Sequence, residues 1–447
     1  MIPETSVTAE TVADRYADYV IGLRYSAIPP GVIDRARHCL VDALGCAIFG
    51  RELPWSKMIL AEVLETGSSG PCEIPGTGGV SLPPSQASFV LGCFAHGFEF
   101  DSLRRPSAGV HPGATVALPA FAVAQATGAP DEEMLLAIVA ACDVMFRIGL
   151  AMRHTPEQAG FHAPGLTGPF GSAIAAGRLM GLSRRQLANA LGIAGSLTGG
   201  LLAFARAGEG GMVKRLHLGR AAEAGVLAAG LAARGFEAPR GVIEGEFGLL
   251  GAFCSNSDPS KLLTELGERF EIESLCLKRF PCHITAHAPV ELLRSWMEEH
   301  NFSGEDVATV KIGGSAKLVS HHSDPAPQDL MLAQYSVPFV IALAAFLDPE
   351  DPANYSTAAL HDPRVRDLAR KVTIGESELV GGWDVEMEVV LLDGRRMKEL
   401  KTSFKGAPET PFTSADLKRK YSKICRDAPG ADALLNRFLA EDRIVGT

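Results

Sequence analysis

Apolar residues recur at helical spacing through most of the chain up to about residue 270. Residues 9–50 predict two amphipathic helices, and the second follows Pro29-Pro30, as is typical of a helix start. Small residues are frequent in the later segments, so we expect close packing between helices. These further helical segments are predicted at residues 85–101, 112–128, 131–152, 170–182, 183–204 and 219–236.

The pattern changes near residue 270. Residues 307–314, 370–375 and 383–404 predict strands, and Asp393-Gly394 marks a hairpin turn within the last of them. Helical spacing returns between these strands and again in the tail, so this part of the chain mixes both kinds of element. The helical segments are predicted at residues 287–300, 332–347 and 413–428.

Together these patterns indicate a mainly α protein with a smaller α+β domain. We expect a large, all-helical domain built from both chain ends, over residues 1–269 and 405–447. The smaller α+β domain is expected over residues 270–404.

Composition narrows the class of protein. The net charge of −10, without a basic stripe, argues against a nucleic-acid partner. The nine cysteines are scattered and form no C-x-x-C pair, which argues against disulfides or structural zinc and favours a reducing cytoplasm. The N-terminal residues lack the apolar core of a signal peptide, and apolar runs are interrupted before ~18 residues, so we expect no membrane span.

Residues 96–114 form the first polar segment in otherwise apolar surroundings. Acids, cations and a histidine share this Gly- and Pro-containing stretch between two helices, a combination that suits acid–base work on an anion. The alternative is a solvated connecting loop, the commoner fate of such segments. The candidate residues are Glu99, Asp101, Arg104, Arg105 and His111.

Two further segments carry a histidine or a lysine beside a helix start. His162 stands just before a Gly-rich helix, where backbone N–H groups can hold a carboxylate. Lys214 precedes a long Ala-rich helix and could bind a carboxylate too. An ordinary capping histidine and a solvated helix flank are the respective alternatives.

The fourth segment, residues 277–287, gathers Lys278, Arg279, His283 and His287 around a proline. Such a loop can direct Lys278 and His283 into one cleft at the domain junction, where pockets are frequent. Tyr335 could reach the same cleft, although a core tyrosine is the alternative. His321-His322 could suggest a metal, but adjacent histidines in a strand or loop point apart, so no metal site is expected.

The order of these segments resembles the MmgE/PrpD family, which includes 2-methylcitrate dehydratases, cis-aconitate decarboxylases and an iminodisuccinate epimerase. The stretches that carry the resemblance are HGFEFDS with VHPGA, GFHAPGLTGPFGSA, KRLHLGRAAEAG, LKRFPCHITAH and AQYSVPF. The resemblance implies a homodimer of two-domain chains, a cleft between the domains, and neither a metal nor an organic cofactor.

The same resemblance implies the roles of individual residues. It gives the catalytic residues as His111, His162, Lys214, Lys278, His283 and Tyr335. It places Glu99 and Asp101 in the family's acidic run, with Arg279 and His287 as companions. Together with Arg104 and Arg105, which this chain adds, these are the expected substrate-binding residues. Two departures matter. The chain reads Asp101-Ser102-Leu103 where family members usually have Asp-Asp-Thr or Asn-Asp-Thr, and it then adds Arg104 and Arg105. These departures leave the substrate and the reaction type open.

The chemistry implied is proton transfer at a carbon next to a carboxylate. Histidines supply the protons near neutral pH, and the lysines stabilise the developing negative charge. We expect a lyase acting on a small di- or tricarboxylic acid, with a 2-methylcitrate dehydratase-like hydro-lyase first. A cis-aconitate decarboxylase-like enzyme ranks second and an epimerase third. A non-catalytic ligand-binding protein is the alternative from another class.

Overall fold

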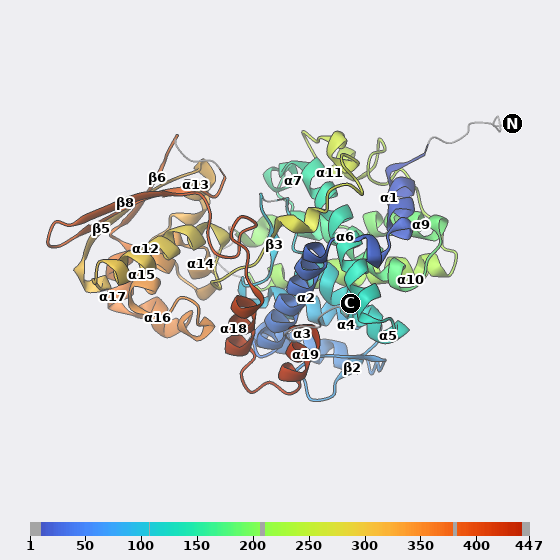
Figure 1. Ribbon diagram of the computed structural model, residues 1–447, viewed down its shortest axis with the longest axis horizontal. Helices are drawn as coiled ribbons and strands as arrows, with labels where there is room; N and C mark the ends of the chain where they lie inside the picture. Colours follow the sequence, from blue (N-terminus) through green and yellow to red (C-terminus); the bar gives the residue numbers. More distant parts are fainter. Residues whose placement is uncertain (1–9, 107, 206–210, 379–381, 440–447) are drawn as a thin grey trace. The chain divides into compact units, whose positions relative to one another are not determined.

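A computed structural model describes residues 10–106, 108–205, 211–378 and 382–439, and the chain forms two compact units (Figure 1). Unit 1 comprises Met1–Gly97, Asp101–Leu275 and Cys425–Thr447. Unit 2 comprises Phe98–Phe100 and Cys276–Ile424. Both chain ends therefore belong to unit 1, as the sequence predicts for the large helical domain.

Unit 1 is built from helices whose starts the sequence encodes locally. Thr11 and Ser183 each form a capping box at a helix N-terminus, and prolines occupy the first turn of several others. The helices are α1 (Val12–Gly22), α2 (Pro30–Gly50), α3 (Pro54–Glu65), α4 (Pro84–Ala95), α5 (Leu118–Thr127), α6 (Asp131–Met152), α7 (Thr155–Gln158), α8 (Ala163–Leu179), α9 (Arg184–Ser196), α10 (Val213–Ala233), α11 (Leu249–Phe253) and α19 (Ala431–Leu439). The short strands β1 (Cys72–Glu73) and β2 (Ser81–Leu82) form an antiparallel pair.

Helix α6 forms the core of unit 1. Its length and apolar composition would suffice to cross a membrane, but 94% of its apolar 18-residue window is buried inside the protein. The helix begins with Asp131, Glu132 and Glu133, which suit the positive end of the helix dipole. The burial is that of a core helix in a globular unit.

Small residues bring α8 and α10 together, as the sequence predicts. A Cβ atom added to Gly225 of α10 would lie 2.4 Å from Ser172 Cβ and 2.5 Å from the Pro169 carbonyl oxygen, both on α8. The Ser172 hydroxyl also donates to the carbonyl oxygen of Ala222, at 2.6 Å. The backbones therefore approach so closely that no side chain fits at residue 225.

Unit 2 contains a four-stranded sheet in the order β6-β5-β7-β8. Strand β5 (Val307–Gly314) is parallel to β6 (Val372–Glu376) and antiparallel to β7 (Val385–Leu391). The predicted hairpin joins β7 to β8 (Arg396–Lys401), and Gly394 supplies the positive φ of 90° in its turn. All three predicted strand regions are confirmed.

Helices complete unit 2, and α12, α15 and α17 lie on one side of the sheet in Figure 1. The predicted helix at 332–347 is interrupted at Ser336, whose hydroxyl caps the second part. The helices are α12 (His287–Glu299), α13 (Ala316–His322), α14 (Leu330–Tyr335), α15 (Val337–Phe346), α16 (Thr357–His361), α17 (Pro363–Ala369) and α18 (Ser414–Ile424). A mainly α protein with a smaller α+β unit is thus confirmed.

The unit boundaries fall elsewhere than residues 270 and 404, because α18 belongs to unit 2. Its Lys420 ammonium donates to the Phe100 carbonyl oxygen at 3.0 Å, and its Asp416 pairs with Lys405 at 2.7 Å. The helical pattern of residues 413–428 does not reveal the contact with Phe100, because the two residues are 320 positions apart in the sequence. The chain returns to unit 1 only at Cys425.

We predict that Gly225→Ala lowers the free energy of unfolding by about 1–3 kcal/mol, because the added methyl group must push α8 and α10 apart. Gly230→Ala on the same helix is the matched control. The nearest atom to its Cβ would be the flexible Arg234 guanidinium at 3.6 Å, so better helix propensity should stabilise the protein by about 0.5–1 kcal/mol. Urea unfolding followed by circular dichroism measures both. Equal effects of the two substitutions would contradict the packing account.

Candidate active site

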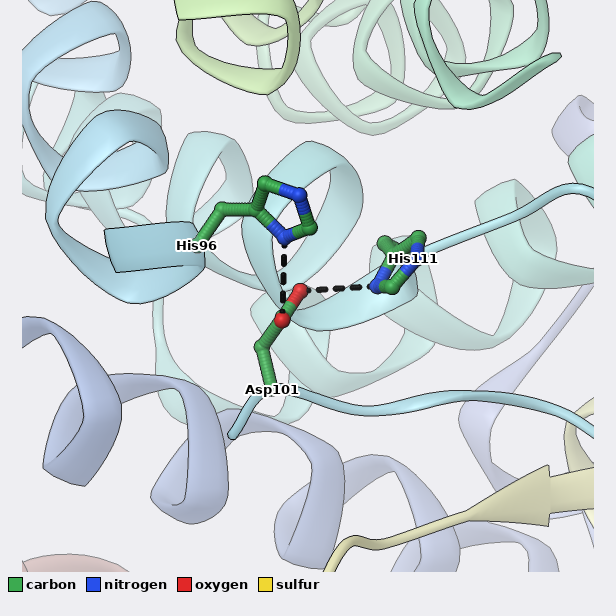
Figure 2. A group of neighbouring side chains, drawn as sticks. All are labelled: His96, Asp101 and His111. Carbon is green, nitrogen blue, oxygen red and sulfur yellow. Dashed lines mark hydrogen bonds and ion pairs between the residues drawn. The ribbon is translucent and has the colours of Figure 1, made fainter. Parts of the chain in front are cut away.

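The Asp101 carboxylate bridges two histidines in unit 1. One oxygen lies 3.0 Å from His96 Nδ1 and the other 2.9 Å from His111 Nδ1, so the carboxylate stands between the two rings (Figure 2). Asp101 and His96 are fully buried, whereas the His111 side chain retains 16% of its exposure. The carboxylate thus fixes both rings and leaves Nε2 of each for other chemistry.

Burial and hydrogen bonding set the charges of this group. Burial opposes the ionisation of Asp101, but the attraction and hydrogen bonds of His96 and His111 hold its pKa well below the usual value. Burial also lowers the pKa of His96 well below its usual value, against the opposing effect of Asp101. An ionised Asp101 beside a neutral His96 therefore accepts an N–H from each ring.

Local structure explains these positions. His96 follows the last residue of α4, and His111 precedes a turn of π-helix, Gly113–Ala117, that leads into α5. The Ser102 hydroxyl oxygen accepts the backbone N–H of Gly113 at 3.1 Å. Ser102 stands where the family pattern differs, and its observed contact ties the segment after Asp101 to the segment after His111.

The same group has the composition of a metal site, since ligand atoms of His96, Asp101 and His111 lie within 4.8 Å of one another. However, the Nδ1–oxygen distances are those of hydrogen bonds, and each Nδ1 faces a separate oxygen of the one carboxylate. A metal bound through these atoms would have to replace both hydrogen bonds. The expectation that no metal is used stays a prediction.

A second histidine pair adjoins the first. His162 Nδ1 lies 3.1 Å from His217 Nδ1, and the His162 and His96 ring centroids are 6.2 Å apart. His162 is the N-cap of α8, and its backbone N–H donates to the Gly200 carbonyl oxygen at 3.0 Å. Burial lowers the pKa of His162 well below its usual value, and the neighbouring His96 and His217 add to the effect.

Lys214 and His217 lie inside α10, whereas the sequence predicted that Lys214 precedes the helix. Lys214 is only 3% exposed, although it occupies the first turn. Burial lowers the pKa of His217, and the positive charge of Lys214 lowers it further. Lys214 therefore belongs to the same group as the histidines of unit 1.

Unit 2 holds a separate polar group around Glu99. The Lys278 ammonium donates to the Glu99 carboxylate at 3.0 Å and to its backbone carbonyl at 2.9 Å. The Tyr335 hydroxyl donates to the other carboxylate oxygen at 3.1 Å. Glu99 has a φ of 55°, which is unfavourable for a residue with a side chain and often marks a functional position.

His283 contributes an imidazole to unit 2. Its ring stacks on that of His322 with centroids 4.0 Å apart, and its Nδ1 lies 2.9 Å from the Thr285 hydroxyl. His322 Nδ1 lies 3.1 Å from the Tyr335 carbonyl oxygen, and burial lowers the pKa of His322 to about 4. The prediction of a strand or loop at His322 is wrong: the residue ends α13 and packs against His283.

Four predicted substrate-binding residues have protein partners instead of open surroundings. Arg104 forms a buried ion pair with Glu271, at 2.6 Å. The backbone of Arg105 is fixed by an N–H donated to the Ser274 carbonyl oxygen at 3.0 Å. The other two residues are Arg279, which pairs with Glu350 and Glu291, and His287, whose ring packs between Phe280 and Phe404.

The structure thus assembles the predicted residues into one group within each unit. Unit 1 holds Asp101, His111, His162 and Lys214, whereas unit 2 holds Glu99, Lys278, His283 and Tyr335. That both groups line one cleft stays a prediction. Sequence reasoning missed His96, His217 and His322, although the first two stand in the motifs HGFEFDS and KRLHLG.

We predict that His162 and His217 adopt opposite tautomers. At an Nδ1–Nδ1 distance of 3.1 Å, one ring must carry the proton and the other must accept it. Ring ¹⁵N NMR at pH 7.5 should show one protonated and one bare Nδ1 for this pair. The variant His217→Phe assigns the signals and should release His162 from the constraint. Two bare Nδ1 atoms in the wild-type protein would refute the hydrogen bond.

We predict that His287 makes stability depend on pH. Burial lowers its pKa well below the usual value, and the positive charges of Lys278 and Lys420 add to the effect. As the pH falls through about 6.5, His287 binds a proton in the unfolded chain but not in the folded chain. The free energy of unfolding therefore falls by up to ~1.4 kcal/mol per pH unit. Urea unfolding at pH 5 to 8 should show a flatter dependence for His287→Leu. An unchanged slope would contradict the assignment.

Comparison with known proteins covers nearly the whole chain. Residues 14–262 match the MmgE/PrpD N-terminal domain and residues 280–439 match the MmgE/PrpD C-terminal domain. Human cis-aconitate decarboxylase is 26% identical over 92% of this chain and 87% of its own length. The cis-aconitate decarboxylase of Aspergillus terreus is 29% identical over 84% and 79%, respectively. A cis-aconitate decarboxylase-like protein of Aspergillus oryzae is 26% identical over 97% and 93%.

These matches confirm the predicted resemblance and the prediction of an enzyme of the lyase type. The two family domains cover all the candidate residues except Lys278 and Arg279, which lie between the matched ranges. The chain belongs to the MmgE/PrpD family.

Proposed function

We propose that this protein is a carboxy-lyase that acts, without a metal or organic cofactor, on cis-aconitate or a closely related unsaturated tricarboxylate. The observation that carries the proposal is the Asp101 carboxylate bridging His96 and His111 in a chain similar to cis-aconitate decarboxylases. On the sequence alone, a hydro-lyase ranks first and a decarboxylase second. These relatives favour the decarboxylase.

The proposed reaction needs one proton and no redox partner. In cis-aconitate, one carboxylate sits on a CH₂ group next to the carbon–carbon double bond. When that carboxylate leaves as CO₂, its bonding electron pair forms a new double bond. The electron pair of the old double bond then takes a proton at carbon, which gives an unsaturated dicarboxylate. The protein must therefore supply a proton and stabilise the negative charge that develops in the transition state.

Of the two candidates His111 and His162, we assign the proton transfer to His111. It keeps partial exposure, and Asp101 holds its Nδ1, which leaves Nε2 to transfer a proton to the substrate. His162, the other candidate, has a pKa well below the usual value and is therefore neutral near pH 7. We assign it to hydrogen bonding with substrate. Lys214 supplies positive charge to the same group.

The group in unit 2 is assigned to carboxylate recognition. Lys278 and Tyr335 converge on Glu99, and a substrate carboxylate would compete with the Glu99 carboxylate for the same two donors. His283, held by Thr285 and stacked on His322, is a third proton carrier. Arg104 is not assigned to substrate, because Glu271 already satisfies its guanidinium.

Two properties of the whole protein complete the proposal. We propose a cytoplasmic enzyme, in keeping with nine free thiols of which eight are buried. We also propose a homodimer that associates through unit 1. Among the described residues, ten of the twelve large apolar side chains exposed to solvent lie in unit 1, including Leu201, Met212 and Phe247.

The decisive experiment is incubation with cis-aconitate in D₂O, followed by NMR and CO₂ capture. We expect one CO₂ per cis-aconitate consumed and one deuterium bound to carbon in the product. Dehydration of 2-methylcitrate or citrate would instead identify a hydro-lyase. Proton exchange into iminodisuccinate without net loss would identify an epimerase. No change in any of these acids would favour a ligand-binding protein.

Asp101→Asn tests the residue assignment, because it keeps the shape of the side chain and removes its charge. We expect kcat to fall ~10²–10⁴-fold, as for loss of general acid catalysis. Lys278→Ala should raise the activation free energy by about 2–4 kcal/mol. Asp432→Asn, an exposed aspartate of α19, is the matched control and should keep wild-type turnover. Wild-type turnover of Asp101→Asn would remove the bridge from catalysis.

A further inference from the structure

Unit 2 contains a cavity of about 300 Å³ that no step of the proposed reaction uses. It is lined by Phe100, Arg279 and Glu350 together with residues of the segment 405–424, including helix α18. None of the histidines lines it, and neither do Glu99, Lys278 or Tyr335. The cavity is therefore distinct from the two groups described above.

Positive charge dominates the walls of this cavity. The charged lining residues comprise five cations, Arg279, Lys405, Arg419, Lys420 and Lys423, and two carboxylates, Glu350 and Asp416. Asp416 already pairs with both Lys405 and Arg419, and Glu350 pairs with Arg279. Two carboxylates outside the lining also take part: Asp348 pairs with Lys423 and Glu291 with Arg279. The excess of cations in a partly enclosed space creates a local field that attracts anions, although the whole chain is negatively charged.

Part of the cavity lining is apolar. Phe100, Phe412 and Ile424 contribute to it, and each is at most 8% exposed. The Lys420 ammonium lies 3.9 Å above the centroid of the Phe100 ring and is itself largely buried. A bare inorganic ion would leave these apolar side chains uncovered. An anion with a hydrocarbon or aromatic body would cover them and gain from the burial.

Phe100 connects the cavity to a proposed substrate-binding residue. Its carbonyl oxygen accepts from Lys420 at 3.0 Å, and its chain neighbour Glu99 holds Lys278 and Tyr335. Gln334 anchors the same turn by donating to the Phe98 carbonyl oxygen at 2.8 Å. A ligand that draws Lys420 away from Phe100 would therefore act on the backbone next to Glu99.

We propose that this cavity, called here the α18 cavity, binds a small organic anion with an apolar body and at least two negative charges. Its charged groups are carboxylates or phosphates. We further propose that occupancy changes the turnover of the enzyme through the Phe100–Glu99 turn, a part that rests on the proposed function. The binding itself does not depend on the reaction.

The test removes two cations from the rim of the α18 cavity. Arg419→Gln/Lys423→Gln changes one exposed and one half-buried side chain, so the fold should persist, as circular dichroism can verify. Lys418→Gln/Arg426→Gln is the control, because it removes the same charge from exposed positions outside the lining. Calorimetry at physiological ionic strength would use benzene-1,3,5-tricarboxylate, phenyl phosphate and inorganic phosphate as probes.

We expect saturable binding of the tricarboxylate or of phenyl phosphate, tighter than that of inorganic phosphate. The rim variant should bind ~10-fold or more weakly, since two charge-assisted contacts are lost, whereas the control should match the wild type. The tighter of the two organic probes identifies the charged group. Equal binding by the rim variant and the wild type would overturn the site, as would a preference for inorganic phosphate.

Turnover of cis-aconitate with the tighter probe tests the second part. We expect the probe to change kcat of the wild-type and control proteins but not that of the rim variant. An equal change in all three proteins would overturn the coupling. If the protein does not turn over cis-aconitate but the rim variant still loses binding, the proposed function fails and the α18 cavity stands.

Discussion

A buried carboxylate that accepts two N–H groups is the constraint on which the rest of unit 1 depends. Asp101 is fully buried, so its charge is tolerable only while His96 and His111 both donate to it. Each donor must then present Nδ1–H, which fixes the tautomer of a neutral ring and leaves its Nε2 without a proton. Helix α4 ends directly before His96, and His111 lies just before the π-helical turn that leads into α5. These elements therefore hold both imidazole rings within hydrogen-bonding distance of the Asp101 carboxylate.

The division between the two units crosses a very short stretch of chain. His96 and Asp101 belong to unit 1, whereas Phe98–Phe100 between them belong to unit 2. His96 and His111 gather around Asp101 in unit 1, and Glu99 brings Lys278 and Tyr335 together in unit 2. The left-handed conformation of Glu99 is maintained by these contacts and by the hydrogen bond that Gln334 donates to Phe98.

Periodicity predicted most of the architecture, because helices and strands depend on local spacing. The strand at 307–314 and the hairpin at Asp393-Gly394 are found where the sequence placed them. The membership of α18 was missed, since it depends on contacts such as Lys420 with Phe100, 320 residues apart in sequence. For the candidate site, the motifs indicated Asp101, His111 and His162 but not the neighbouring His96 and His217. His96, His217 and His322 belong to the two polar groups because of how their rings are oriented. A sequence does not show the direction in which a ring nitrogen points.

Arg104 shows that a position near a motif does not by itself predict a substrate contact. Its place next to the acidic run suggested a contact with substrate. Instead, its guanidinium donates to the carboxylate of Glu271, which lies 167 residues further along the chain. Ser102 differs from the family pattern, yet it has a definite structural contact. Its hydroxyl oxygen accepts the backbone N–H of Gly113.

The close approach at Gly225 ties helix packing to the geometry of the candidate site. Because two helix backbones touch there, any side chain at residue 225 would force α8 and α10 apart. His162 sits at the beginning of one of these helices, and Lys214 and His217 sit near the beginning of the other. A single methyl group at residue 225 would therefore alter the spacing between His162 and the two residues of α10.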